Sequence, residues 1–317
     1  MNELDIIGKL RKIINNPSAL NLNDDVFFDK KKGLVISVDT YNIGTHFIDF
    51  KRPDLVIKKI LRSSISDLIC KGVKPKYYFI AGSGNKKNFT KNNLEKISNS
   101  LREEQKKYDL LLGGGDTTFS NKLSFTITSV GYSKKIIYRN QSNVNNDIYV
   151  TGNLGDSFIG LQVLKNKIKL NKSKRKYFIN KYYMPDIQNK FSKNLLSLAT
   201  SSMDISDGLI TDLNKLINKQ NVSYKIYEKF IPVSRNLNNL INTRNLKKID
   251  LVSNGDDYQI LFTAKPNNAR IINKLSKSLG VKISKIGTIL SGKNKSLILD
   301  QKGREIANNV SGYVHQF

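Results

Sequence analysis

The stretch of residues 110–118 restricts the fold of this chain more than any other. An apolar run ends in Gly113, Gly114 and Gly115, and Asp116 follows at once. This order predicts a strand that delivers a carboxylate into a backbone without side chains, where main-chain N–H groups can approach a ligand and the acid can meet a hydrated cation. A hairpin turn is the alternative, because glycine clusters commonly follow strands.

Short aspartate motifs flanked by hydroxyl or glycine residues recur along the chain. They are Asn23-Asp24-Asp25, Ser37-Val38-Asp39-Thr40, Ser66-Asp67, Asp204-Ile205-Ser206-Asp207-Gly208 and Gly255-Asp256-Asp257. Among the 26 acidic residues Asp greatly outnumbers Glu, although helix surfaces favour Glu. The short carboxylate is therefore used for more than surface charge. Several such groups can hold Mg²⁺ rigidly against nucleotide phosphates.

Strands and helices are expected to alternate through the first 135 residues. The predicted strands are residues 34–38, 77–81, 108–112 and 123–130, and the predicted helices begin at Pro53 and at residue 92. Asp39 would lie at the end of its strand, and Asp67 in the last turns of its helix before Gly72. The alternation predicts one mixed α/β sheet.

A polar stretch at residues 140–146 separates a second half of similar character. It begins with a predicted strand at 147–151, a turn at 152–157 and a helix at 158–164. A phosphate could dock at that helix N-terminus, but an N-cap at Asp156 or Ser157 explains the same residues. The basic run 165–176 is expected to be a solvated loop.

The remaining signals place two further acidic motifs beside regular elements. Asp204 and Asp207 precede a predicted helix at 209–218, so a cation held there would lie at its first turn. Asp256 stands at the entry of a strand at 258–263, which is followed by a helix at 266–279. For 317 residues this predicts an α/β (α+β) chain of two domains, 1–137 and 138–317.

The net charge of +27 at pH 7 raises the possibility of a nucleic-acid partner. The basic residues are spread along the whole chain, and no zinc spacing, aromatic RNA-binding signature or basic recognition helix is found. We therefore expect no nucleic-acid partner, and steering of anionic nucleotides is the expected consequence of the charge.

The cysteine content and the hydropathy of the sequence indicate the cellular compartment. Cys70 is the only cysteine, so an intrachain disulfide is impossible. Residues 1–14 predict a charged amphipathic helix and not a signal segment, and no run approaches the roughly 18 apolar residues of a membrane span. A soluble cytoplasmic protein without membrane contact is expected.

The order of the motifs resembles the thiamine-monophosphate kinases, a family within the superfamily of aminoimidazole-ribonucleotide synthetase and selenophosphate synthetase. The resemblance rests on the acidic motifs above, on Gly44-Thr45-His46-Phe47 and on Thr151-Gly152 with Gly155-Asp156-Ser157. It runs from Glu3 to His315, and seven motifs stand in family order.

The resemblance implies an activity, a fold and an assembly. The activity is direct transfer of the ATP γ-phosphate to thiamine monophosphate, giving thiamine diphosphate, with several Mg²⁺ ions and no phosphoenzyme. The fold is that of aminoimidazole-ribonucleotide synthetase, in which the N-terminal sheets of two subunits pair into a barrel, so a homodimer is expected. The absence of a Walker A motif and of a dinucleotide fingerprint agrees with nucleotide binding through carboxylates and glycine turns.

The resemblance also assigns roles to individual positions. It implies Asp116 and Asp207 as catalytic residues. It implies Asp24, Ser37, Val38, Asp39, Asp67, Asp116, Asp204 and Asp207 as magnesium ligands, Gly115, Asp116, Arg139 and Ser206 as ATP contacts, and His46, Asp256 and Tyr313 as substrate contacts. Taken without the resemblance, the histidine and tyrosine would be structural residues and Arg139 a surface charge.

Several positions depart from the family pattern. Asn23 replaces a Gly, Val38 replaces a Thr and so offers only its carbonyl, and Asp256 replaces a Glu and is shorter by one methylene. Arg139-Asn140-Gln141 replaces Arg-Ser-Gly. Two alternatives stay open: another ATP-dependent enzyme of the superfamily, and a catalytically silent nucleotide-binding protein. Cys70 lies within a predicted helix and the chain ends in Gln316-Phe317, which disfavours the selenophosphate and hydrogenase-maturation members.

Overall fold

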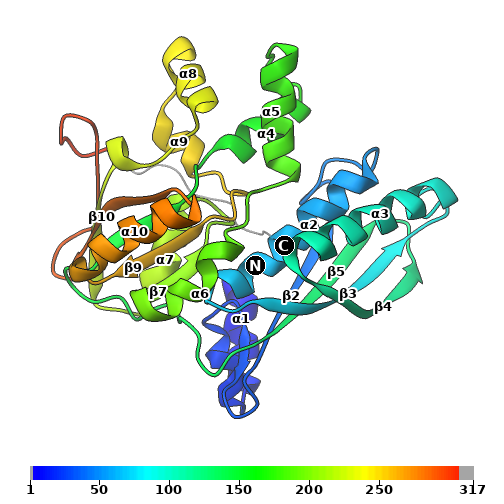
Figure 1. Cartoon of the computed structure of the whole chain (residues 1–317), viewed down its shortest axis with the longest axis horizontal. Coiled ribbons are helices and arrows are strands. Elements are labelled where there is room, and N and C mark those ends of the chain that lie inside the picture. The colour runs from blue at the N-terminus through cyan, green and yellow to red at the C-terminus, as the bar shows by residue number, and fades with distance from the viewer. Residues whose placement is uncertain (1–2, 307–317) are drawn as a thin grey trace.

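The structure is a computed structural model and describes residues 3–306 (Figure 1). Two mixed sheets lie side by side, one from each half of the chain, with helices packed against both. Tyr313, one of the predicted substrate contacts, lies outside the described residues. Within those residues, no helix is both long and apolar enough to cross a bilayer.

The first sheet has the strand order β1-β2-β5-β3-β4. Its elements follow the short helix α1 (Glu3–Leu10) and 3-10 turns, and are β1 (Phe27–Asp29), β2 (Leu34–Asn42), α2 (Pro53–Cys70), β3 (Pro75–Gly84), α3 (Lys91–Tyr108), β4 (Leu111–Phe119) and β5 (Ser124–Tyr132). Only β3 and β4 pair in parallel, joined through α3, and all other pairs are antiparallel. Helices α2 and α3 cover one face of this sheet (Figure 1).

The second sheet has the strand order β11-β8-β10-β6-β9-β7. Its strands are β6 (Asp147–Thr151), β7 (Ala199–Asp204), β8 (Val222–Tyr227), β9 (Ile260–Ala264), β10 (Ile283–Ser291) and β11 (Leu297–Leu299). Its helices are α4 (Asp156–Leu164), α5 (Lys172–Tyr183), α6 (Asn189–Leu198), α7 (Leu209–Ile217), α8 (Arg235–Arg244), α9 (Lys248–Val252) and α10 (Ala269–Leu279). Only β11 and β8 are parallel, so this sheet is mixed as well.

Helix α2 lies between the two sheets and is buried on nearly every side. Pro53 provides its first helical residue, and Gly72, at φ +79°, turns the chain after its end. One face packs on β2 and β5, while other residues contact β7, α5 and α6. A single apolar cluster accordingly joins Val56 and Ile60 of α2 to residues of β6 and β9. The helix is thus enclosed on nearly every side, although its sequence is not apolar all round.

Most predicted elements of the first half are confirmed, with two corrections. Strand β2 continues to Asn42, so Asp39 lies within the strand and not at its end. Strand β4 does not stop before the glycines but runs through them to Phe119, so the hairpin alternative is also wrong. The reason is close strand pairing: a Cβ on Gly115 would lie 1.8 Å from the carbonyl oxygen of Ile80 on β3.

The sequence left two explanations for the residues at the N-terminus of α4, a docked phosphate or an N-cap at Asp156 or Ser157. Neither Asp156 nor Ser157 caps the helix; its N-cap is Gly155. The carboxylate of Asp257 instead accepts a hydrogen bond from the Gly155 N–H at 2.8 Å. Because the chain supplies its own anion at this helix end, an external phosphate is not needed there. The basic run 165–176 is a loop only in its first part, since α5 begins at Lys172 behind an Asn171 N-cap.

Candidate active site

A stripe of polar residues runs along α2 and organises the site. Lys59, Ser63 and Ser66 with Asp67 on α2, and Lys71 directly after it, follow one another at intervals of about one helical turn, and all but Asp67 are buried. Each meets a different acidic or polar group of the surrounding elements. The helix thereby connects three groups of carboxylates that are far apart in the sequence.

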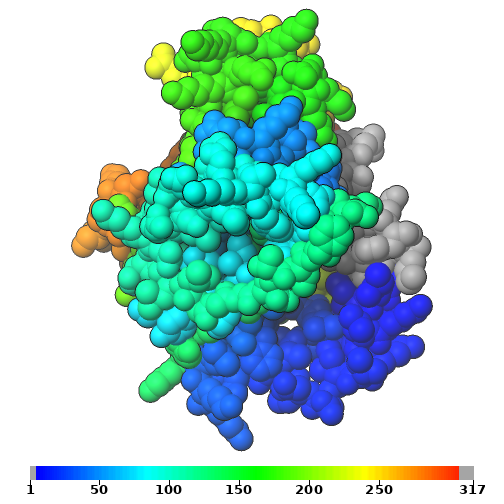
Figure 2. Space-filling model, turned by 90° about the vertical axis from the view of Figure 1, so that its right-hand side faces the viewer, coloured from blue at the N-terminus to red at the C-terminus, as the bar shows by residue number. Residues whose placement is uncertain are grey.

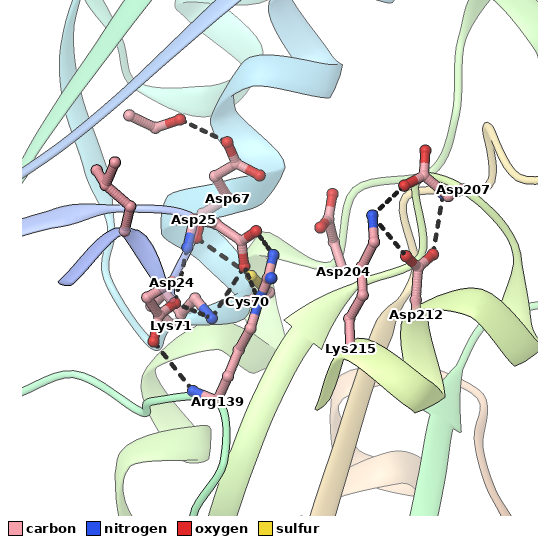
Figure 3. Close-up of polar contacts among 12 residues, drawn as sticks. Asp24, Asp25, Asp67, Cys70, Lys71, Arg139, Asp204, Asp207, Asp212 and Lys215 are labelled. Carbon is pink, nitrogen blue, oxygen red and sulfur yellow. Dashed lines mark hydrogen bonds and ion pairs between the residues drawn. The ribbon is translucent and has the colours of Figure 1, made fainter. Parts of the chain in front are cut away.

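The central carboxylate cluster consists of Asp39 on β2, Asp67 on α2 and Asp204 at the end of β7. The Ser37 hydroxyl donates to Asp67 at 2.5 Å, and the Ser66 hydroxyl donates to Asp204 at 2.5 Å. Figure 3 shows Asp67 and Asp204 on neighbouring elements. The cluster confirms the convergence expected for these three acids.

The electrostatics of the central carboxylate cluster indicate that a compensating positive charge is lacking there. Burial, followed by the charge of Asp204, raises the pKa of Asp39 to about 7. Burial and then the charge of Asp39 raise the pKa of Asp67 well above its usual value, and burial also raises the pKa of Asp204. Among residues 3–306 no lysine or arginine forms an ion pair with any of the three. The Oδ2 atom of Asp39 is buried without a hydrogen-bond partner. These residues therefore fit a bound cation.

The side chains of β2 alternate between the two faces of the sheet. Ser37 points inward to the cluster, whereas Val38 is 61% exposed on the opposite face. The Val38 side chain therefore takes no part in the cluster, which agrees with the expectation that this position offers only its carbonyl.

Asp207 lies beside the central carboxylate cluster but has a cation of its own. Lys215 on α7 forms an ion pair with it and approaches Asp212 at 3.9 Å. Asp212 accepts hydrogen bonds from the N–H groups of Asp207 and Gly208, so it shapes the loop that carries Asp207. Burial and the charge of Asp207 raise the pKa of Asp212 to about 8.

The acid pair Asp24–Asp25 lies at the C-terminal end of α2 and is fully ion-paired (Figure 3). The Lys71 ammonium lies 2.6 Å from Asp24 and 3.1 Å from Asp25. Arg139 forms an ion pair with Asp25 and donates its backbone N–H to Asp24 at 3.0 Å. The pair thus differs from the central carboxylate cluster because positively charged side chains of the protein neutralise it.

The predicted substrate contact Asp256 stands at the other end of α2. Its carboxylate lies 2.8 Å from the Lys59 ammonium and accepts from the Tyr258 hydroxyl at 3.0 Å. Its N–H donates to the carbonyl of Ser206 at 2.8 Å, which ties its loop to the loop of Asp204 and Asp207. Asp256 has φ +62°, a conformation uncommon for a residue other than glycine.

His46 belongs to the same region through Tyr182. The Tyr182 hydroxyl donates to the His46 carbonyl at 3.1 Å, and the Lys59 ammonium lies 3.9 Å from the Tyr182 ring centre. The Nδ1 atom of His46 accepts from the Asn42 N–H at 2.9 Å. The ring is therefore oriented by backbone, with Tyr182 linking it to Lys59 and Asp256.

Asp116 is not brought to the central carboxylate cluster within one chain. It lies on the edge strand β4, paired with Ala81 of β3 and exposed to solvent. Strands β5 and β3 separate β4 from the strand of Asp39, a distance of roughly 14 Å at the usual strand spacing. The expectation that all five acids converge is therefore wrong for Asp116. Gly115 beside it is explained by the close approach of β3.

Sequence reasoning missed the basic and aromatic members of the site. These are Lys59, Lys71, Tyr182, Lys215 and the buried acid Asp212. A signal existed for the two lysines on and after α2, because they interrupt an otherwise apolar pattern at positions that face inward. Nothing comparable marks Tyr182, whose contacts depend on how α5 packs against α2.

Comparisons with known proteins first define the class. The family model described as AIR synthase related protein, N-terminal domain, matches residues 22–133, and that of the C-terminal domain matches residues 143–300. The two-domain α/β fold with two mixed sheets is thus that of the AIR synthase related proteins.

Curated relatives narrow the class to one family. The thiamine-monophosphate kinase of Haemophilus influenzae is 30% identical over 298 residues, covering 91% of this chain and 89% of that protein. That of Buchnera aphidicola subsp. Acyrthosiphon pisum is 32% identical over 319 residues, covering 95% and 97%. The chain belongs to the thiamine-monophosphate kinase family.

A solved structure shares the fold over nearly the whole length. It is described as AaThiL complexed with AMPPCP and TMP, and has a TM-score of 0.86 at 23% identity. The match covers 99% of this chain and 97% of that one. At this identity the likeness concerns the fold.

Proposed function

We propose that this protein transfers the γ-phosphate of ATP directly to thiamine monophosphate, giving thiamine diphosphate, with Mg²⁺ at the central carboxylate cluster. Full-length similarity to thiamine-monophosphate kinases supports the reaction. The observation that carries the site is the buried Oδ2 atom of Asp39, which has no partner beside two further acids.

Mg²⁺, when bound, would neutralise phosphate charge and orient the γ-phosphoryl group. Asp39, Asp67 and Asp204 would supply oxygens for it, and the Ser37 and Ser66 hydroxyls hold two of these carboxylates in place. Asp207, which is ion-paired with Lys215, would be a further ligand for such an ion. Phosphoryl transfer of this kind depends on positioning and charge, so no residue of the chain needs to act as a nucleophile.

The nucleotide and substrate contacts remain those predicted by position. Gly115, Asp116, Arg139 and Ser206 are proposed for ATP, and His46, Asp256 and Tyr313 for thiamine monophosphate. The hydrogen bond from Asp256 to the Ser206 carbonyl supports a phosphoryl acceptor beside the nucleotide. Lys59 holds Asp256 in its conformation, so it is a positioning residue for that contact.

A homodimer formed through the first sheet is part of the proposal. The face of that sheet opposite α2 and α3 carries exposed apolar side chains, including Val38 and Phe79. Edge strand β4 adds Leu111 and Phe119, the latter 78% exposed. Figure 2 views the molecule from the side of this first half. An uncovered apolar sheet face is a typical interaction surface, and pairing of two such faces would close a barrel.

The deciding experiment measures phosphate transfer from ATP to thiamine monophosphate by the purified protein, with thiamine and an aminoimidazole ribonucleotide precursor as competing acceptors. Mg²⁺-dependent formation of thiamine diphosphate is expected, and turnover with another acceptor alone would overturn the proposal. Light scattering of the active sample tests the dimer, which a monomeric active enzyme would contradict.

The role of Asp116 has its own test. Asp116→Asn should lower turnover by orders of magnitude, as expected for a residue that meets the nucleotide or its metal. Because this side chain is exposed and far from the other acids, melting without Mg²⁺ should not change. Near-normal turnover would remove Asp116 from the catalytic set.

A further inference from the structure

Lys71 is a fully buried lysine whose three donors are all used. Its ammonium lies 2.6 Å from Asp24 Oδ1, 3.1 Å from Asp25 Oδ2 and 2.8 Å from the carbonyl oxygen of Ser202. An ammonium group has three N–H donors, and each has one oxygen here. Two carboxylates and a carbonyl are also the ligands that a divalent cation takes. The ammonium therefore occupies a position with the coordination of a metal site.

The remaining oxygens of the acid pair are engaged as well. Asp24 Oδ2 accepts the Arg139 backbone N–H at 3.0 Å. Asp25 Oδ2 accepts from Arg139 Nε at 2.9 Å, and Asp25 Oδ1 forms an ion pair with the same guanidinium. All four carboxylate oxygens thus have protein donors. Two negative and two positive side chains balance the charge locally.

We propose that Lys71 is an internal counter-ion that takes the place of a divalent cation at the Asp24–Asp25 pair, so that this chain holds its metal ions without Asp24. This departs from the position-based expectation that Asp24 is a magnesium ligand. Asp24 and Asp25 become positioning residues, which fix Lys71 and the guanidinium of Arg139. The inference rests on the proposed Mg²⁺ site only in that the Asp24–Asp25 pair lies next to the central carboxylate cluster.

A divalent cation could reach Asp24 only by approaching the enclosed ammonium. Lys71 is 0% exposed, so its charge can be neither solvated nor moved aside without opening the end of α2. A divalent cation beside this ammonium would be repelled, because like charges in a buried site repel strongly.

The Asp24–Asp25 pair and the central carboxylate cluster are neighbours, although only the pair has positively charged partners. Ligand atoms of Asp25, Cys70 and Asp204 lie within 4.8 Å of one another. The positively charged side chains that act on Asp204 are Arg139 and Lys71. Lys71 and Arg139 therefore lie on one side of the central carboxylate cluster only. Asp39, Asp67 and Asp204 remain for metal ions.

The test counts Mn²⁺ bound per full-length chain by equilibrium dialysis, without nucleotide or substrate. Asp24→Asn should bind the same number of ions as the unmodified protein. Lys71→Met, of similar length but neutral, should bind one more, and the double variant Lys71→Met/Asp24→Asn should lose that ion again. Asp39→Asn is the matched control and should bind fewer ions.

An Asp24→Asn variant that binds one ion fewer than the unmodified protein would overturn the inference, as would a Lys71→Met variant that gains none. If Lys71→Met does not fold, the Asp24→Asn count decides alone, because Asn keeps the shape of the side chain. Turnover is not part of this readout. Failure to phosphorylate thiamine monophosphate would therefore remove the proposed function and leave the ion counts standing.

Discussion

The central carboxylate cluster and the Asp24–Asp25 pair are two acidic groups that lie against the same helix, α2, and their charges are compensated in different ways. The pair has Lys71 and Arg139 within ion-pair distance, and every oxygen has a donor. The cluster has hydroxyl partners, raised pKa values and one unpartnered oxygen. The difference shows that the number of aspartates in a motif does not identify a metal site. A metal site is identified by carboxylates for which the protein itself provides no cation.

The strongest way to break the comparison is to remove the internal cation. Lys71→Met leaves two buried carboxylates with one counter-charge fewer, and loss of one member of a buried ion pair typically costs about 3 to 5 kcal/mol. We expect a loss of this order in urea unfolding measured with a chelator present. Lys74→Met is the matched control, since Lys74 pairs with the exposed Asp109 at the surface. Equal loss in both variants would contradict the buried ion-pair assignment.

Removing a carboxylate from the central carboxylate cluster should have the reverse effect on stability. Asp67→Asn removes one repulsive charge, so the metal-free protein should melt at a higher temperature than the unmodified one. Turnover should fall by more than roughly 100-fold, the upper range for changes to groups that merely support a metal ligand. Thermal melting with chelator and steady-state phosphate transfer are the two measurements. A metal-free variant that melts lower would argue against repulsion among these acids.

The pH dependence of the metal-free protein sharpens the same contrast. The pKa of Asp39 in the folded protein is about 7, above the roughly 4 expected when unfolded. The folded state therefore binds this proton more tightly, so its stabilising contribution is present at low pH and is lost as pH rises from about 4 to about 7. The slope is at most about 1.4 kcal/mol per pH unit for each such group.

Melting temperatures in chelator should accordingly fall between pH 5 and 7.5, and Asp39→Asn should show a shallower fall. Adding Mg²⁺ should oppose the trend, because ionised carboxylates bind it better. A flat or rising curve without metal would mean that Asp39 is ionised throughout this range.

The smallest effect is expected from the hydroxyl groups. Ser37→Ala removes the donor to Asp67, which should change stability by only about 1 kcal/mol. Mn²⁺ affinity should weaken by roughly 10-fold, because the carboxylate is less well oriented. Calorimetric titration with Mn²⁺ measures this, with Ser197→Ala on the exposed surface of α6 as control. Unchanged affinity would assign Ser37 a purely structural role.

Local sequence signals predicted the elements that carry the acids better than the way those elements meet. The helix ending near Asp67 and the strand 147–151 were predictable, because their apolar spacing and their proline or glycine limits are local. Residues 199–204 and 222–227 gave no such prediction, and they form β7 and β8. The glycines of β4 were misread because the reason for Gly115 is the backbone of another strand.

The site shows the same division. Asp39, Asp67 and Asp204 were found from their motifs, since hydroxyl-flanked aspartates are a local pattern. The partner of each buried cation was not, because Lys59 meets Asp256 and Lys71 meets Asp24 only after folding. A lysine within a helix is ordinarily solvated, so its burial cannot be derived without the elements that enclose it.

The course of α2 through the molecule has a consequence for how the chain can be divided. The helix belongs by sequence to the first half, yet Ser192 of α6 and Asp204 of β7 bond directly to its residues. A fragment ending near residue 137 would lack both, and it would leave Lys59 and Lys71 without Asp256 and without the Ser202 carbonyl. Such a fragment would expose apolar surface together with two lysine ammonium groups that have lost these partners. The two halves are therefore expected to fold as one cooperative unit, and exchanging either for that of a relative would require α2 to be exchanged with its surroundings.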